Sequence, residues 1–210
     1  MESSDFKIIK RFGPSVLKVK IPEDIINKLN NHFDKVILDK NESKRLNHGE
    51  DLVGDVTQEL KLEKDIMEKS GWIKFLGSNI DKWMKEEVGR GITKFIMINS
   101  WIVRQYKNEY NPTHWHNGHI SAAGYLKLPD DFGPSKQEKA GNDHGKINFV
   151  HGSRQFLSMP IHSFKPEVGK IFLFPNYTMH SVNPFFGKGE RRSISFNARI
   201  DDRIYDIYAQ

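Results

Sequence analysis

The segment Asn111-Pro-Thr-His-Trp-His116 carries the residues around which the rest of the chain can be arranged. Trp115 separates its two histidines, and side chains two residues apart on an extended strand point to the same side. Imidazole nitrogens are common ligands of iron, zinc, copper and nickel. Because the chain has nine histidines, one such pair is weak evidence by itself. Residues further along the chain indicate whether this pair belongs to a metal site.

Two later residues complete a candidate metal site. His180 follows the apolar run Lys170-Ile-Phe-Leu-Phe-Pro175, which predicts a buried strand, and Arg191 comes eleven positions after His180. Three protein ligands leave coordination positions open for chemistry. An arginine is a permanent donor for a carboxylate. His114, His116, His180 and Arg191 together predict a metal centre that holds an acidic small molecule.

The composition is typical of a soluble protein. Of 210 residues, 37% are hydrophobic and 28% are charged, which suits one domain with a substantial core. The formal charge of +5 is spread along the chain, so no nucleic-acid partner is called for. The absence of cysteine excludes disulfides and thiolate ligands. The start lacks a signal-peptide pattern and no apolar run could span a bilayer, so we expect a cytoplasmic protein without a membrane partner.

The first 91 residues predict mainly helices that support the rest. Residues 6–20 alternate loosely and predict two short strands or a hairpin. Pro22 opens a helix that continues to about residue 38, and residues 71–88 form a second amphipathic helix that Gly89 ends. The polar residues 39–65 suit either a turn with a strand or a loose helix.

From residue 92 the pattern changes to short strands. The strands are expected at Ile92–Tyr106, His119–Leu128, Lys146–Val150, Gly169–Phe174 and Arg191–Ile200. The polar segment Pro129–Gly145 predicts a loop and is a candidate lid. We therefore expect a single domain over residues 1–210, in which a β core at 92–200 forms an antiparallel barrel or jelly roll.

Alternation along the last strand separates a polar face from an apolar one. Arg191, Ser193, Ser195 and Asn197 share one side. Such a face usually meets solvent, but in a jelly roll it can line a polar cavity, and the buried lead-in to His180 favours the cavity. In the strand at 119–128, small residues share a face with Tyr125 and leave room for a ligand, although a core tyrosine explains this pattern equally well.

Five segments, taken in order, resemble the Fe(II)- and 2-oxoglutarate-dependent oxygenases. They are similar above all to a prolyl-hydroxylase-like branch found in bacteria and bacteriophages. The segments are Asn111–His116, Ser121–Leu126, Gly169–Pro175, His180–Pro184 and Arg191–Asn197. This resemblance covers roughly residues 92–200. It implies a mainly β fold with supporting helices, namely a double-stranded β-helix, which is a cupin-like jelly roll.

The resemblance also implies roles for individual residues. His114 and His180 match metal ligands of the family. Arg191 matches the residue that pairs with the far carboxylate of 2-oxoglutarate, and Tyr125 matches a tyrosine that hydrogen-bonds the same carboxylate. Two further residues, Asn197 and Tyr106, match side chains that line the pocket in relatives.

Position 116 departs from the family pattern. The family usually has Asp or Glu there, whereas this chain has His116. Three neutral ligands would leave the iron site one charge more positive. His119, Asp130 and Asp131 are alternative third ligands, but they lie further from the spacing of the motif.

The implied activity is hydroxylation of an unactivated C–H bond, with Fe(II) as cofactor and with 2-oxoglutarate and dioxygen consumed. A prolyl residue of a protein or peptide is the leading substrate, ahead of a free amino acid or another small molecule. Two alternatives stay open. One is a cupin-like three-histidine metalloenzyme without 2-oxoglutarate, which the position of Arg191 disfavours. The other is a non-catalytic jelly roll that binds a partner.

Overall fold

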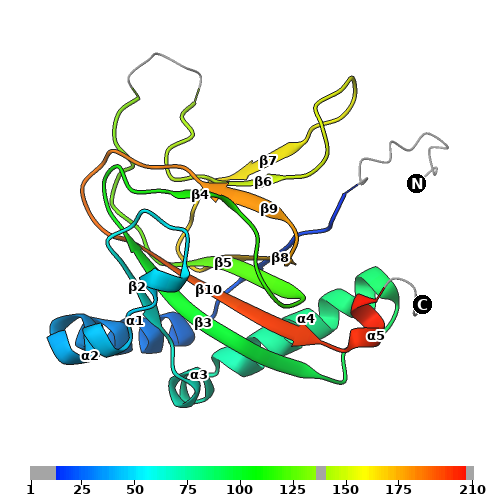
Figure 1. Cartoon of the computed structure of the whole chain (residues 1–210), viewed down its shortest axis with the longest axis horizontal. Helices are drawn as coiled ribbons and strands as arrows, with labels where there is room; N and C mark the ends of the chain where they lie inside the picture. Colours follow the sequence, from blue (N-terminus) through cyan, green and yellow to red (C-terminus); the bar gives the residue numbers. More distant parts are fainter. Residues whose placement is uncertain (1–12, 136–140, 207–210) are drawn as a thin grey trace, which may run out of the picture.

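The computed structural model describes residues 13–135 and 141–206 and contains two antiparallel sheets that face each other (Figure 1). The larger sheet has six strands, in the order β1 (Leu17–Lys20), β8 (Lys170–Pro175), β5 (Ile120–Lys127), β10 (Arg191–Ile200), β3 (Phe95–Gln105) and β2 (Gln58–Lys61). The smaller sheet has four strands, in the order β4 (Asn111–His114), β9 (Met179–Val182), β6 (Ile147–Val150) and β7 (Ile161–Phe164). This confirms the predicted jelly roll.

Helices lie against the outer face of the larger sheet (Figure 1). Those that bury residues against it are α1 (Glu23–Leu38), α3 (Lys64–Ser70), α4 (Trp72–Val88) and the short α5 (Asp202–Tyr205). The chain also forms α2 (Lys40–Arg45), which buries none of its residues, and a 3-10 helix at Gly49–Asp51 beside β2. Among the described residues, no helix is both long and apolar enough to cross a membrane.

The sequence located the longer elements and missed several short ones. The two predicted helices are α1 and α4, and the five predicted strands are β3, β5, β6, β8 and β10. Strands β4, β7 and β9 were not predicted, because each has only four residues and none is an apolar run. Of the hairpin expected at 6–20, the structure describes only residues 13–20, which contain β1.

The apolar side of β10 belongs to the core beneath the larger sheet. Ile194, Phe196 and Ile200 are buried in one cluster with residues of α1 and α4. The ring of Phe196 meets the indole of Trp72 edge-on, with centroids 6.5 Å apart. Because side chains alternate along a strand, the polar residues of β10 face the space between the two sheets. The cavity interpretation of that face is therefore confirmed.

A second apolar cluster fills part of the space between the sheets. It contains Tyr125, Phe149, Phe172 and Phe174. Beside it, β9 pairs with both β4 and β6, and this register sets His180 opposite His114 on one side and opposite Phe149 on the other. Strand pairing thus brings together two histidines that are far apart in the sequence.

Gly118 fixes the turn that follows the two histidines of the β4 segment. Its φ is +88°, and an added Cβ would lie 2.7 Å from the carbonyl oxygen of Ala198. The next residue, His119, donates its backbone N–H to that same oxygen at 2.8 Å. A side chain at position 118 would push this turn away from β10.

Gly118→Ala should lower the free energy of unfolding by more than about 2 kcal/mol, because a left-handed backbone already costs an L-residue roughly 1–2 kcal/mol and the backbone contact adds to that cost. Gly152→Ala is the matched control, since its φ is +71° and no described atom lies within 4 Å of its added Cβ. Urea denaturation of both variants measures the difference. Equal losses of stability would contradict this account of the turn.

Candidate metal centre and adjoining pocket

Three imidazoles meet between the sheets. His114 ends β4, His180 lies on the neighbouring strand β9, and His116 lies just beyond β4. One nitrogen of each ring lies within 4.8 Å of the other two. Within residues 13–135 and 141–206, no other group of three or more His, Asp or Glu side chains is close enough to hold a metal. The structure therefore brings together the three predicted ligands.

Backbone carbonyl groups set the protonation of two of these rings. Nδ1 of His114 lies 2.7 Å from the Pro112 oxygen, and Nδ1 of His180 lies 2.9 Å from the Thr178 oxygen. A carbonyl oxygen only accepts, so each Nδ1 carries the proton and each Nε2 keeps a lone pair. Metal-binding histidines are commonly oriented by such a bond from the second nitrogen.

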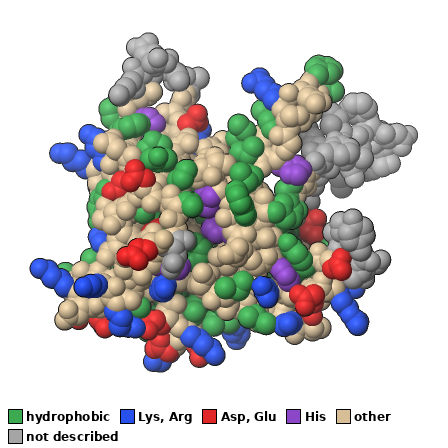
Figure 2. Space-filling model, in the orientation of Figure 1, with side chains coloured by type: hydrophobic (Ala, Val, Ile, Leu, Met, Phe, Trp, Pro, Cys, Tyr) green, Lys and Arg blue, Asp and Glu red, His purple; other side chains and the backbone are tan. Residues whose placement is uncertain are grey.

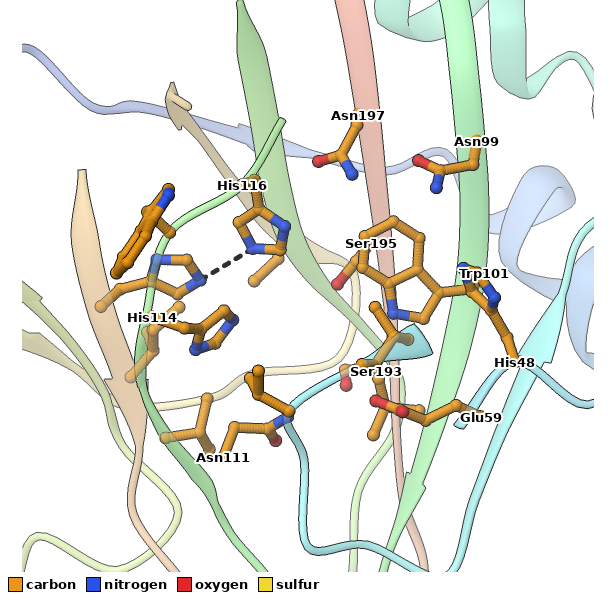
Figure 3. Close-up of a pocket in the computed structure, with 18 of the residues that line it drawn as sticks. His48, Glu59, Asn99, Trp101, Asn111, His114, His116, Ser193, Ser195 and Asn197 are labelled. Atoms are coloured by element: carbon orange, nitrogen blue, oxygen red, sulfur yellow. Dashed lines mark hydrogen bonds between the residues drawn. The ribbon is translucent and has the colours of Figure 1, made fainter. Parts of the chain in front are cut away.

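The ring of His116 lies close to the other two. Nε2 of His116 lies 3.1 Å from Nε2 of His180, drawn as a dashed line in Figure 3. The His116 ring also lies beside the indole of Trp101, with centroids 5.8 Å apart. Two lone pairs and a third ring nitrogen thus share one small space, which fits a metal ion held by imidazoles.

Burial keeps all three imidazoles neutral near pH 7. Burial, with smaller contributions from the neighbouring His180 and His114, lowers the pKa of His116 to about 2. Burial, with a smaller contribution from His114, lowers the pKa of His180 to about 3. Burial also lowers the pKa of His114, against a raising effect of the Pro112 carbonyl. Neutral imidazole is the form that binds metals.

The histidines open onto a pocket of about 370 Å³ between the sheets. Figure 2 shows histidine side chains near the centre of this face of the molecule. The larger sheet supplies most of the facing wall. Its lining residues include Asn99, Trp101 and Val103 of β3, Arg191, Ser193, Ser195 and Asn197 of β10, and Glu59 of β2.

Arg191 forms the basic part of the pocket. Its side chain is almost completely buried, and its guanidinium carbon lies 5.5 Å from the centre of the Tyr125 ring. Nη1 donates to the Gly145 oxygen at 3.1 Å, whereas Nε and the Tyr125 hydroxyl have no hydrogen-bond partner among the described residues. Burial lowers the pKa of Arg191 and raises that of Tyr125. Unpaired buried donors are costly, so this pair fits an anionic ligand that accepts from both.

The other predicted pocket residues lie in different surroundings. Asn197 lines the pocket, and its Oδ1 accepts a hydrogen bond from the Ser121 hydroxyl at 2.8 Å. Tyr125 is buried beside Arg191 rather than on the pocket lining. Tyr106 is not among the lining residues, and its hydroxyl accepts from Arg104 at 2.6 Å. The structure therefore does not bring Tyr106 to the pocket.

The alternative third ligands do not join the histidines. His119 accepts a hydrogen bond from the Ile200 backbone and stacks on Tyr205 at 3.9 Å between ring centroids. Asp130 and Asp131 are exposed, and Asp131 accepts from the Gly133 backbone. Only His116 of these candidates lies within metal-binding distance of His114 and His180.

The candidate lid at residues 129–145 is described only in part, since residues 136–140 lie outside the described ranges. Its two ends are hydrogen-bonded to the segment before β10. The Phe132 oxygen accepts from the Phe186 N–H, and the Gly145 N–H donates to the Pro184 oxygen. Its role as a lid stays a prediction.

Sequence reasoning missed Glu59, which lines the pocket from β2. Its side chain is 2% exposed, and burial raises its pKa to about 7. Residues 39–65 show no clear periodicity, so nothing in that stretch marks a pocket residue. Glu59 becomes visible only because β2 pairs with β3.

Comparisons with known proteins agree with this geometry. Residues 99–197 match the family described as "Putative 2OG-Fe(II) oxygenase". No curated protein sequence matches the chain.

Solved structures of prolyl hydroxylases share the fold. A prolyl-4-hydroxylase from Pseudomonas putida is 13% identical, with a TM-score of 0.56, over 87% of this chain and 91% of that one. A collagen prolyl hydroxylase of Paramecium Bursaria Chlorella virus-1, in complex with 2OG, is 14% identical, with a TM-score of 0.55, over 87% and 94%. A Trichoplax adhaerens prolyl hydroxylase bound to a hypoxia inducible factor peptide is 12% identical, with a TM-score of 0.54, over 93% and 87%.

The family match covers the β core that carries His114, His116, His180 and Arg191. Fe(II) and 2-oxoglutarate are the cofactor and cosubstrate of that family, and the donor set of the pocket suits both. Through this core, the chain is similar to the Fe(II)- and 2-oxoglutarate-dependent oxygenases.

Proposed function

We propose that this oxygenase hydroxylates an unactivated C–H bond at a centre where His114, His116 and His180 hold Fe(II). In this proposal, Arg191 and Tyr125 bind the far carboxylate of 2-oxoglutarate. One observation carries the proposal. Three ring nitrogens converge within 4.8 Å on the wall of a pocket that also contains a buried arginine with an unpaired donor.

In this proposal, different residues of the chain have different roles. Fe(II), when bound, supplies the dioxygen chemistry, which belongs to the metal and cosubstrate rather than to the protein. His114 and His180 present lone pairs that the Pro112 and Thr178 carbonyls have already oriented. Arg191 is held in place before the cosubstrate arrives, which reduces the cost of ordering it on binding.

Apolar rings around the centre exclude water from it. The centroid of Phe174 lies 4.6 Å from that of His180, and the centroid of Phe149 lies 6.0 Å from it. A drier site strengthens electrostatic contacts and protects a reactive centre from side reactions.

The primary substrate that we propose is a prolyl residue of a protein or peptide. The support is the similarity in fold to prolyl hydroxylases, one of which is bound to a peptide fragment. The side chain of Trp115, next to two of the proposed ligands, is 65% exposed and offers a contact surface for such a chain. A cytoplasmic location, inferred from the sequence, is proposed with it.

Succinate release in the presence of different peptides tests whether a prolyl residue is the substrate. Proline-containing peptides should raise the rate above that without substrate, and the same peptides with alanine in place of proline should not. Stimulation by free amino acids or other small molecules alone would contradict the peptide substrate while leaving the oxygenase chemistry intact.

His116→Ala should abolish tight Fe(II) binding, because two imidazoles remain where three converged. His116→Asp should retain binding, since a carboxylate restores the usual ligand set of the family. Anaerobic titration should give about one Fe(II) per wild-type chain, as one three-ligand site implies. His119→Ala is the control and should bind like wild type. If His116→Ala kept full affinity for Fe(II) and Asp130→Ala or Asp131→Ala lost it, the third ligand would come from the loop instead of from position 116.

Arg191→Ala should weaken 2-oxoglutarate binding by about 2–5 kcal/mol, as expected when one partner of a buried charge pair is removed. Fe(II) binding should survive. Arg199→Ala, an exposed change on the same strand, serves as the control. Arg192 is paired with Asp34 and Glu190 at 2.8 and 3.0 Å, so its loss should affect stability instead. Weaker 2-oxoglutarate binding in Arg192→Ala but not in Arg191→Ala would contradict the assignment.

The metal-free protein should lose stability as pH falls below about 6.5. The pKa values of His116 and His180 in the fold, about 2 and 3, are below the ordinary value of 6.5, so the unfolded chain takes up protons first. Each imidazole should contribute up to about 1.4 kcal/mol per pH unit between pH 6.5 and its pKa in the fold. Urea midpoints from pH 7 to 5 measure this slope. The slope of stability against pH should be shallower in His180→Gln than in wild type, and it should be unchanged in a variant of the exposed His162. Equal slopes in wild type and both variants would contradict the assignment of neutral, buried histidines.

A further inference from the structure

Glu59 is the only acid among the described residues that line the pocket. It lies on β2, opposite Val103 of β3, and its side chain is 2% exposed. Its Oε2 atom has no hydrogen-bond partner in the described part of the chain. A buried carboxyl oxygen without a partner is costly, and such groups are common at functional sites.

The summed charge of the other groups in the pocket indicates which positive charge Glu59 balances. Three neutral imidazoles add no negative charge to Fe(II), unlike a triad with one carboxylate. The iron dication and the 2-oxoglutarate dianion cancel, which leaves the single positive charge of Arg191. An ionised Glu59 in the same pocket would bring the sum to zero, as a carboxylate at position 116 would.

We propose that Glu59 supplies, from the larger sheet, the negative charge that His116 does not supply to the metal centre. The inference rests on the proposed roles of the three histidines as ligands. Glu59 acts through space, because it is not part of the group whose ligand atoms lie within 4.8 Å of one another. Figure 3 shows the side chains of Glu59 and His114 on opposite sides of the pocket.

The surroundings of Glu59 suit this role. Burial alone raises the pKa of Glu59 to about 7, so in the metal-free protein its carboxyl group is partly protonated near neutral pH. A dication in the same pocket favours the ionised form. The other titratable and charged side chains of the pocket are His48, the three proposed ligands and Arg191. The pKa values of His116 and His180 are far below 6, so these two carry no proton to release at that pH.

The test compares wild type with Glu59→Gln, which removes the charge and keeps the shape. Anaerobic calorimetry with Fe(II) and 2-oxoglutarate at pH 6, in two buffers of different ionisation enthalpy, counts the protons released. Wild type should release close to one proton more than the variant. At pH 7 the variant should bind Fe(II) roughly a hundredfold more weakly, as expected for a unit negative charge and a dication on the order of 10 Å apart at an effective dielectric constant of about 20.

Two further variants make the result specific. Glu63→Gln removes a partly exposed acid that is paired with Arg45, and it should behave like wild type. His116→Asp should release fewer protons than wild type at pH 6, because the new carboxylate supplies the charge and leaves less reason for Glu59 to ionise.

Equal proton release and equal Fe(II) affinity in wild type and Glu59→Gln would overturn the inference while leaving the histidine site intact. If Glu59→Gln changed only the substrate-dependent release of succinate, the inference would also fail, and Glu59 would be a substrate contact. Absence of Fe(II) binding to wild type would instead overturn the proposed metal site, and this inference with it.

Discussion

The pairing of β4 with β9 is the constraint on which the site depends. It places His114 directly opposite His180, and the Pro112 and Thr178 carbonyls hold both rings with Nε2 free. These short strands have little apolar surface of their own. They keep their register because β6 pairs with the other side of β9 and the aromatic cluster between the sheets packs beside them. The proposed metal centre is therefore a product of sheet register rather than of any local motif.

The larger sheet makes the complementary contribution. Its outer face is buried under helices, so the alternate face of β10 can carry Arg191, Ser193 and Asn197 inward without exposing an apolar surface to water. Among the described residues, Nε of this buried guanidinium has no partner, which is costly for folding and fits the proposed role of Arg191 in binding a carboxylate. A fold with helices on one side and a second sheet on the other can tolerate such a polar interior, since the apolar core lies elsewhere.

Sequence patterns predicted the features that depend on periodicity and spacing. The His-x-His segment, the apolar run before His180 and the position of Arg191 grouped these four residues, and the family resemblance implied their roles. Four-residue strands such as β7 and β9 carry too few residues for a period to emerge. Tyr106 was expected in the pocket, but its hydroxyl binds Arg104 instead. Glu59 could not be found, because only the pairing of β2 with β3 brings it to the wall.

The central claim is that three neutral histidines and Arg191 together hold Fe(II) and 2-oxoglutarate. The most direct measurement is an ultraviolet–visible titration under nitrogen, in which Fe(II) and then 2-oxoglutarate are added to the protein. The account predicts a weak visible charge-transfer band that needs both additions, saturates at one Fe(II) per chain and is absent in His180→Ala. Iron that binds without producing this band when 2-oxoglutarate is added, or a band that His180→Ala retains, would contradict it.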